Sequence, residues 1–395
     1  MSDLERLIQE LCPDGVEYRK LEDCLNYEQP TKYIVKDAKY NDTYPTPVLT
    51  AGQTFILGYT NENTGIYQAS KEEPVIIFDD FTTGFHWVDF DFKVKSSAMK
   101  MLRPACDDIS FRYVYYAMAS IHFEPGTHTR HWISIYSQFE IPVPPLPVQE
   151  EVVRILDTLT ELQAELQAKL QVELQKRLQQ YNFYRNQLLS FEGKNTRILQ
   201  LQQCVSDDCS MSYGIVQPGD DYLGGVPVVR PVDLSKRIIH IQGIKTIKPE
   251  LLHSYARTEL KGGELLVCVR GTTGVVSFAG DDLRGGNVSR GIVPLRFNSL
   301  VDAHYMYHLF NSDYVRTQIE SKTRGAALQQ INVGDLKKIL IPIPSMEEQE
   351  RIVAILDRYE TMTTDLTAGL PAEIEARPKQ YEYYRDRLLT FKQKS

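Results

Sequence analysis

The sequence predicts a mixed α/β protein with two globular domains, each followed by a long helix, and with the two helices packed as an antiparallel coiled coil. Three observations predict this fold. A set of motifs recurs after 200 residues, a leucine repeat without proline marks a long helix, and short apolar runs between turn residues fill the remaining chain. We therefore expect globular domains at residues 1–147 and 193–345 and spacer helices at residues 148–192 and 346–395.

The repeat joins a proline motif to a helix. The first copy has I-P-V-P at 141–144, Q-E at 149–150 and I-L-D at 155–157, and the second has I-P-I-P, Q-E and I-L-D 200 residues later. In the same register, Q-Y-N-F-Y-R at 180–185 recurs as Q-Y-E-Y-Y-R at 380–385. The segments between these motifs share only short islands, such as T-T-G at 82–84 and 272–274. The two halves therefore share one framework of repeated motifs, while the variable segments that this framework carries differ.

The central helix is predicted by leucines at every fourth position, each followed by glutamine: Leu162, Leu166, Leu170, Leu174 and Leu178. A step of four residues overshoots one turn by about 40°, so the stripe winds slowly around a helix of roughly 65 Å. Such a stripe needs a covering partner, either a second copy of the chain or the matching C-terminal segment. Chain direction favours the C-terminal segment, because each helix leaves its own domain at the proline motif and antiparallel packing then places the domains at opposite ends of one rod.

The C-terminal helix is expected to be less regular. Gly369, Leu370 and Pro371 predict a stop followed by a restart, since proline is tolerated in a first turn. Pro378 is expected to kink the second piece or delay its start.

The globular segments alternate short strands and helices. Runs such as 74–78, 265–269 and 291–295 are rich in β-branched residues and are bounded by turn residues. Helical stretches at 111–120 and 303–319 carry aromatic residues at helical spacing, which are expected in the core rather than on a base-stacking surface.

The bulk composition limits the possible functions. The formal net charge of -8 excludes a protein that holds nucleic acid mainly by global positive charge, so local patches or a partner must attract it. No apolar run reaches the roughly 20 residues of a membrane span, and the start lacks the order of a signal peptide, so we expect a cytoplasmic protein without a membrane partner. The six cysteines are scattered and are expected to be reduced, with no metal site.

No motif for catalysis is present: neither a phosphate-binding loop nor a serine-hydrolase elbow nor a zinc-protease helix is found. Glu259-Leu260-Lys261 resembles the E-x-K of metal-dependent nucleases, but such triplets are common by chance. The pairs Asp79-Asp80 and Asp281-Asp282 are explained by solvated turns.

The duplicated plan of variable segment, I-P-x-P, Q-E, I-L-D, long helix and Q-Y-x-x-Y-R resembles the specificity subunits of type I restriction-modification systems. P-D-G-V-E-Y at 13–18 and R-G-T-T-G at 270–274 are also similar to segments of that family. The resemblance implies two target recognition domains, each of which reads one half of a bipartite site in double-stranded DNA. It also implies that the helices dock two modification subunits, which bind S-adenosylmethionine. Restriction and translocase subunits, which use ATP and magnesium, would complete the complex, and this chain would be non-catalytic and bind no cofactor.

Residues that could touch DNA are the hydroxyls, amides, cations and glycines of turns, because these groups bind phosphates and base edges. In the second domain they are Arg270, Gly271, Thr272, Thr273, Asn287, Ser289, Arg290, Lys322, Arg324, Gln329 and Gln330. In the first domain they are Tyr59, Thr60, Asn61, Asn63, Thr82, Thr83, Gly84, His128, Thr129 and Arg130.

Two other functions remain open from the residues alone. A stand-alone metal-dependent nuclease would need a cluster of carboxylates, and its purified chain would cut DNA with magnesium. A coiled-coil scaffold without nucleic acid would have no reason for two divergent domains rich in Arg-Gly and Thr-Gly loops.

Overall fold

The computed structural model describes residues 3–52, 54–126, 129–191, 196–324, 329–364 and 369–394. The chain divides into two compact units. The first contains the residues up to Lys169 and those from Ile374 onward, and the second contains Leu170–Glu373. Each unit thus combines one globular domain with parts of the long helices.

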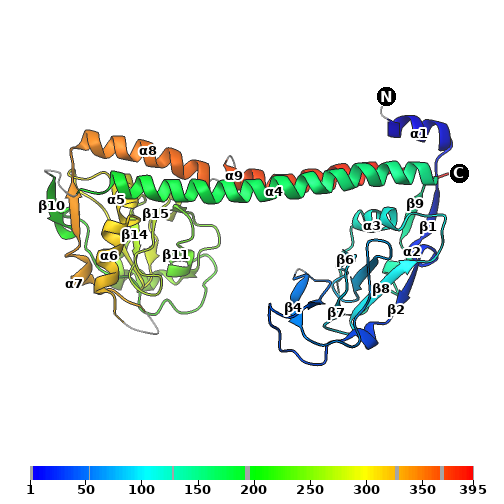
Figure 1. Cartoon of the computed structure of the whole chain (residues 1–395). Coiled ribbons are helices and arrows are strands. Elements are labelled where there is room, and N and C mark those ends of the chain that lie inside the picture. Colours follow the sequence, from blue (N-terminus) through cyan, green and yellow to red (C-terminus); the bar gives the residue numbers. More distant parts are fainter. Residues whose placement is uncertain are drawn as a thin grey trace. The chain divides into compact units, whose positions relative to one another are not determined.

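The first unit contains a four-stranded antiparallel sheet in the order β2-β8-β5-β6, a three-stranded sheet in the order β4-β3-β7, and the antiparallel pair β1-β9 (Figure 1). Its strands are β1 (Glu17–Lys20), β2 (Leu25–Glu28), β3 (Thr46–Leu49), β4 (Ile56–Thr60), β5 (Val75–Asp79), β6 (Phe85–Val88), β7 (Lys93–Val94), β8 (Met99–Pro104) and β9 (Glu140–Val143). Its helices are α1 (Asp3–Leu11), α2 (Leu21–Cys24), α3 (Phe111–Ala119) and the 3-10 helices Pro30–Tyr33 and Tyr136–Gln138.

The second unit follows a related plan, with sheets in the orders β12-β15-β14-β17 and β13-β11-β16 and the antiparallel pair β10-β18. Its strands are β10 (Arg197–Gln200), β11 (Val226–Val229), β12 (Ile238–Ile239), β13 (Thr246–Ile247), β14 (Leu265–Cys268), β15 (Val276–Ala279), β16 (Asn287–Val288), β17 (Ile292–Leu295) and β18 (Leu340–Ile343). Its helices are α5 (Ala303–Phe310), α6 (Asp313–Lys322), α7 (Val333–Leu336), α8 (Met346–Thr364) and the 3-10 helices Leu201–Gln203, Pro231–Asp233, Pro249–Thr258 and Asp281–Leu283.

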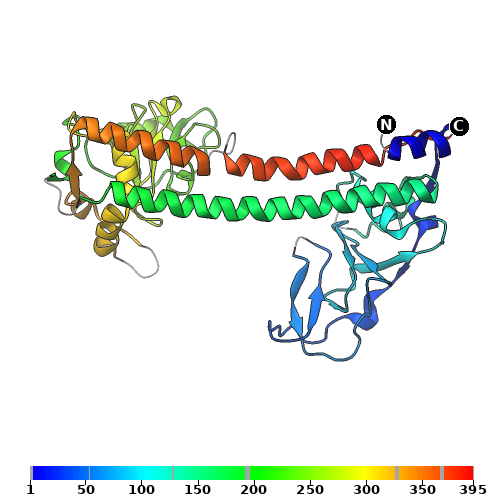
Figure 2. The same cartoon turned by 45° about the horizontal axis from the view of Figure 1, so that its top comes forward.

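Two helices pass from one unit into the other: α4 (Leu146–Leu188) and α9 (Leu370–Leu388). Within the first unit they lie side by side in both views (Figures 1 and 2). The Thr160 and Tyr381 hydroxyls are 2.8 Å apart, and Gln167 reaches the Ile374 carbonyl at 3.5 Å. The residue numbers of the contacts rise along α4, from 160 to 167, while they fall along α9, from 381 to 374. The pair is therefore antiparallel, and the predicted intramolecular coiled coil is confirmed.

In the second unit the C-terminal part of α4 packs against α8, where the rings of Tyr184 and Tyr359 stack with centroids 5.4 Å apart. The predicted restart is confirmed, because α9 begins at Leu370 directly after Gly369, while α8 is described as far as Thr364.

Pro378 lies inside α9, so the expectation that it would delay the start of the helix is wrong. Proline has no N–H, so the carbonyl four residues earlier, that of Ile374, loses its partner within the helix. The Gln167 side chain of α4 donates to that carbonyl at 3.5 Å. A glutamine of the leucine-glutamine repeat thus offsets part of the cost of the proline.

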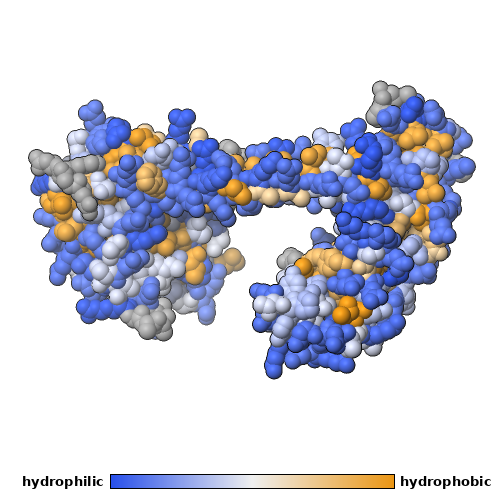
Figure 3. Space-filling view, in the orientation of Figure 1, coloured by the Kyte–Doolittle hydropathy of each residue, from blue (hydrophilic) through white to orange (hydrophobic). Residues whose placement is uncertain are grey.

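The leucine stripe crosses the helix interface instead of following it. Leu162 is 56% exposed, Leu170 is 9% exposed and Leu178 is 36% exposed. This drift is the consequence of a step of four residues on a helix of 3.6 residues per turn. Apolar side chains are accordingly visible at the surface along the helices (Figure 3).

The repeated motifs hold each globular domain on its helix with the same bonds. The Tyr113 hydroxyl of α3 donates to the Pro142 carbonyl at 3.0 Å, and the Tyr305 hydroxyl of α5 donates to the Pro342 carbonyl at 3.0 Å. These tyrosines are fully buried, so the expectation that the aromatic residues of these helices belong to the core is confirmed. The framework that the repeat predicted is therefore present in both domains, and equivalent hydrogen bonds hold it in each.

The six cysteines are all free, as expected. In the part of the chain that the structure describes, no helix combines the length and the apolar character that a membrane crossing requires.

Candidate nucleic-acid interface

In the second domain the structure brings together three loops that the sequence singled out. The first is the turn between β14 and β15, which contains the T-T-G motif and in which Gly271 and Gly274 both have φ near +89°. These left-handed conformations favour glycine and allow the tight turn. The turn places Arg270 at its start and the side chains of Thr272 and Thr273 at its tip.

The second loop, which ends α6, joins this turn through main-chain bonds. Gly271 N–H donates to the Gln329 carbonyl at 2.9 Å, and the backbones of Arg324 and Gln330 exchange two hydrogen bonds of 2.9 Å. The third loop, between β16 and β17, contacts the same corner, since Val269 N–H donates to the Gly291 carbonyl at 2.7 Å. The backbone network therefore collects Arg270, Arg290 and Arg324 in one region.

Arg270, Arg290 and Arg324 form no ion pair with any residue that the structure describes, whereas Arg230, Arg237 and Arg296 of the same domain do. Arg290 and Arg324 are exposed and Arg270 is half-buried. By contrast, Lys261 of the E-x-K triplet pairs with Asp208 at 2.8 Å. Unpaired guanidinium groups beside exposed threonine and glutamine side chains can bind phosphates and base edges. We name this set, with Thr272, Thr273, Lys322, Gln329 and Gln330, the arginine corner.

Two residues predicted from the same loops do not face solvent. Asn287 is fully buried, and its side chain accepts from the Thr258 hydroxyl at 2.7 Å and donates to the Tyr255 carbonyl at 3.0 Å. Ser289 is also buried, at 8% exposure. In this structure these buried side chains hold the loop from inside, so we leave them out of the accessible set.

In the first domain the structure places the T-T-G turn next to the segment that contains Thr129 and Arg130. Asp80 joins them, because its carbonyl accepts from His131 N–H at 2.8 Å and its carboxylate accepts from Trp132 N–H at 2.9 Å. Thr82, Thr129 and Arg130 are exposed at this place. His128 lies outside the described residues.

The turn itself is tightly built. Thr83 has φ of 57°, which is the left-handed region, and it is buried at 8% exposure. A Cβ on Gly84 would come within 2.4 Å of the Ala51 carbonyl oxygen. Thr83 and Gly84 therefore shape the turn, and the Thr83 side chain lies outside the accessible set.

The remaining predicted loop of this domain, residues 59–63, lies at the other end of its strand. Thr60 of β4 pairs with Thr46, whereas Ile56 pairs with Leu49, which is close to Ala51 and the turn. Four residues of strand separate the two ends by about 13 Å. Thr60 is also buried, at 1% exposure, so only Tyr59, Asn61 and Asn63 remain accessible there.

Two accessible segments beside these loops were missed by sequence reasoning. Tyr213 is 49% exposed, and its neighbour Ile215 exchanges main-chain bonds with Val288 and Arg290. In the first domain, His86 bonds to the Gly52 carbonyl at 3.1 Å, which brings the segment around Thr54 to the T-T-G turn. Neither segment contains a turn motif or a cluster of cations, so no local signal identified it.

The aspartate of each I-L-D motif forms hydrogen bonds with side chains of its globular domain. Asp157 of α4 accepts from Arg112 at 2.9 Å and from the Tyr116 hydroxyl at 2.5 Å. Asp357 of α8 accepts instead from His308 at 2.7 Å and pairs with Arg237 at 2.7 Å. The carboxylate is the same in both copies, but each domain supplies different donors.

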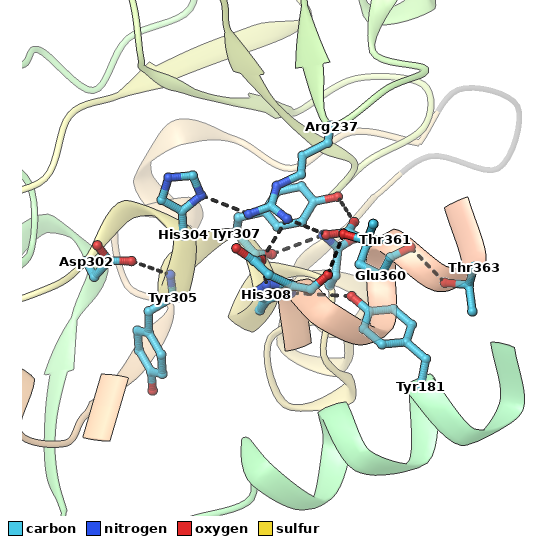
Figure 4. A network of polar contacts seen from close by, with 12 residues as sticks. Tyr181, Arg237, Asp302, His304, Tyr305, Tyr307, His308, Glu360, Thr361 and Thr363 are labelled. Carbon is cyan, nitrogen blue, oxygen red and sulfur yellow. Dashed lines mark hydrogen bonds and ion pairs between the residues drawn. The ribbon is translucent and has the colours of Figure 1, made fainter. Parts of the chain in front are cut away.

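Figure 4 shows the wider network around His308, Arg237 and Glu360. Arg237 also pairs with Glu360 at 2.7 Å, and the Tyr307 hydroxyl donates to Glu360 at 2.7 Å. Burial would raise the pKa of Asp357, but the hydrogen bonds from His308 and Arg237 outweigh burial and lower it. His308, Asp357 and Glu360 are close enough to hold a metal ion, yet both carboxylates already receive the Arg237 guanidinium. This network therefore fastens the domain to the helix.

The paired aspartates also have structural partners. Asp80 is buried and forms an ion pair with Lys100 at 3.2 Å, so the expectation of a solvated pair at 79–80 is wrong. Asp282 accepts from the Ile241 N–H at 3.0 Å. Both contacts support loops of the domains.

Comparison with known proteins agrees with this architecture. Residues 13–176 and 220–376 match the type I restriction modification DNA specificity domain. The chain is 42% identical over 420 residues to the specificity subunit of the type I restriction enzymes EcoR124I and EcoR124II of Escherichia coli, with 99% of this chain and 97% of that protein covered. It is 29% identical to a putative type I restriction enzyme specificity subunit of Haemophilus influenzae, with 98% of each covered.

Two solved structures share the fold. A chain from a study of complex assembly and conformational transition of the type I R-M system has a TM-score of 0.66 at 17% identity, with 95% of this chain and 98% of that chain covered. The HsdS subunit from Thermoanaerobacter tengcongensis has a TM-score of 0.51 at 16% identity, with 96% and 97% covered. Because the family domain matches most of the sequence and the Escherichia coli relative spans nearly all of it, this chain belongs to the family of type I restriction-modification DNA specificity proteins.

Proposed function

We propose that this chain is the DNA-recognition subunit of a type I restriction-modification complex, in which each globular domain reads one half of a bipartite site. The observation that carries the proposal is the contrast between the two copies. The bonds from Tyr113 and Tyr305 to the proline motifs are alike, whereas the exposed turns differ in residues and charge. Two domains that are held to their helices by equivalent bonds, but that expose different loops, are suited to reading two different half-sites.

The side chains that would read DNA are those of the predicted loops that are exposed or half-buried. In the second domain they are those of the arginine corner, with Tyr213 beside them. In the first domain they are Thr82, Thr129 and Arg130, with Tyr59, Asn61 and Asn63 as a separate accessible group. Arginine bonds to guanine in a bidentate manner, and threonine and glutamine bond to either groove edges or phosphates.

The chain has no catalytic role in this proposal, and it acts in the cytoplasm, where bacterial DNA is found. Two modification subunits dock on the helices and bind S-adenosylmethionine, and restriction and translocase subunits use ATP and magnesium. Support comes from the membership of the family and from the ion pairs that Asp80, Asp357 and Glu360 form with Lys or Arg. The stand-alone nuclease and the scaffold without nucleic acid have no comparable support.

The test is sequencing of methylated sites in cells that carry this chain with its modification subunits. We expect one bipartite motif with an unread spacer, and no such motif in cells that lack only this chain. Arg270→Ala should then relax or weaken the half-site of the second domain and leave the other half-site unchanged; a base contact is worth about 1–3 kcal/mol at one position. A continuous motif, or methylation that persists without the chain, would contradict the proposal.

A further inference from the structure

The arginine corner of the second domain is a concentration of positive charge that the domain itself does not neutralise. Arg270, Arg290 and Arg324 form no ion pair with the residues that the structure describes, and main-chain bonds hold their three loops together. Because these bonds join the three loops, the three unpaired cations belong to one region of the domain. This arrangement is suited to a polyanion that meets all three.

The equivalent corner of the first domain has the opposite character. Asp80 stands two residues before T-T-G, as Arg270 does in the second domain. Its carboxylate points inward, where it pairs with Lys100, a lysine with no exposed surface. Lys93 is likewise buried, at 1% exposure, and pairs with Glu62 at 3.1 Å. Two cations of the first domain, Lys93 and Lys100, are therefore buried and neutralised by carboxylates inside the fold.

Composition extends the contrast to whole domains. Residues 193–345 contain 18 Lys and Arg against 14 Asp and Glu, whereas residues 1–147 contain 13 against 21. The acidic balance of the chain therefore resides largely in the first domain. Since attraction to DNA depends on released counterions, the two domains cannot attract a duplex equally.

We propose that the two domains divide the work of DNA binding unequally: the second supplies most of the phosphate-neutralising charge, and the first reads its half-site mainly through uncharged hydrogen-bonding groups. This inference rests on the proposed function. It predicts that the salt dependence of binding belongs mostly to the arginine corner. It also implies that cations from another subunit must approach the DNA near the first half-site if that half is held tightly.

The experiment compares two triple variants of the full chain, each assembled with its modification subunits. One is Arg270→Gln, Arg290→Gln and Arg324→Gln; the matched control is Lys71→Gln, Lys95→Gln and Arg130→Gln, which removes three exposed cations of the first domain. Fluorescence anisotropy measures affinity for a labelled duplex that carries the recognised sequence, between 50 mM and 200 mM KCl. Thermal unfolding checks that both variants fold.

Each lost phosphate contact reduces the steepness of the plot of log K against log salt by about 0.9. The slope of the arginine-corner variant should therefore be shallower than that of the parent by about 2.7. The parent complex should then lose roughly forty-fold more affinity over this salt range than the variant does. The slope of the control variant should be shallower than that of the parent by about 1 or less, because only Arg130 lies at the predicted DNA-facing loops. Equal losses in both variants, or an unchanged slope in the arginine-corner variant, would overturn the inference while leaving the proposed function intact. A parent complex that does not bind the duplex would overturn the proposed function itself.

Discussion

Replacement of Gln149 by methionine should destabilise the first unit selectively. The Gln149 side chain is fully buried; it donates to the Pro144 carbonyl at 2.7 Å and accepts from the Ser110 N–H at 2.8 Å. Methionine has a similar length and fills the same space, but it makes neither bond. The substitution therefore removes the hydrogen bonds that join the proline motif, the start of α3 and the start of α4.

The size of the effect follows from the two backbone groups that lose their partner. A buried group without a hydrogen bond costs about 1–3 kcal/mol. The Ser110 N–H is only partly buried, so water recovers part of its bond, and the free energy of unfolding of the first unit should fall by about 2–4 kcal/mol. With a urea m value of about 2–3 kcal/mol/M, the midpoint should fall by about 0.7–2 M.

Tryptophan fluorescence is the assay, because the only two tryptophans, Trp87 and Trp132, both lie in the first unit. Gln349→Met removes the equivalent bonds in the second unit, to the Pro344 and Leu300 carbonyls and from the Asp302 N–H. That variant should shift the transition seen by circular dichroism and leave the fluorescence transition in place. Glu150→Gln, at the exposed neighbouring position, is the control and should shift neither. An unchanged fluorescence midpoint in Gln149→Met, or an equal fluorescence shift in Gln349→Met, would refute the reasoning.

Three further predictions concern the chemistry, the helix and the ionised network. The isolated chain is expected neither to cut nor to methylate DNA, and magnesium-dependent cleavage by pure protein would contradict this. One additional L-Q-x-x unit within 162–178 lengthens α4 by about 6 Å and turns its far end by about 40°. Since one base pair adds about 3.4 Å and roughly 35°, the recognised sequence should keep both half-sites and gain one base pair of spacer. An active enzyme with the old spacer would contradict the idea that the length of α4 sets the spacer. The lowered pKa of Asp357 means that its stabilisation is present above the unfolded value, about 3.9, and is lost as pH falls toward the folded value. Asp357→Asn should therefore flatten the acid side of the stability profile of the second unit, and a profile of unchanged slope would count against this.

Local patterns in the sequence were sufficient to predict the architecture. The repeat predicted one frame used twice, and Tyr113 and Tyr305 form equivalent bonds to the carbonyls of the two proline motifs. The absence of proline and the leucine spacing predicted α4, and Gly369 with Pro371 predicted the restart of the last helix. These features depend on helical period, on backbone conformation and on turn residues, all of which are local and therefore visible in the order of residues.

Burial could not be predicted in the same way. The sequence placed Asn287, Ser289 and Thr83 among residues that touch DNA, because polar side chains in turns resemble one another whether they face solvent or the core. The packing of distant segments decided the matter: Thr258 and Tyr255 take up the Asn287 amide, and the T-T-G turn closes over Ala51.

The sequence by itself determined that this protein has two copies of one frame, a long proline-free helix and two divergent faces, because period and spacing are properties of neighbouring residues. Only the tertiary structure decided which loops contact one another and which side chain binds the carbonyl that Pro378 leaves free. Arg270, Arg290 and Arg324 are far apart in the chain and meet through main-chain bonds between loops. Pro378 breaks the rule for helix interiors, yet α9 continues through it and Gln167 bonds to the carbonyl that the proline leaves free. The physical reason is that such bonds join residues distant in sequence, and their partners are set by packing.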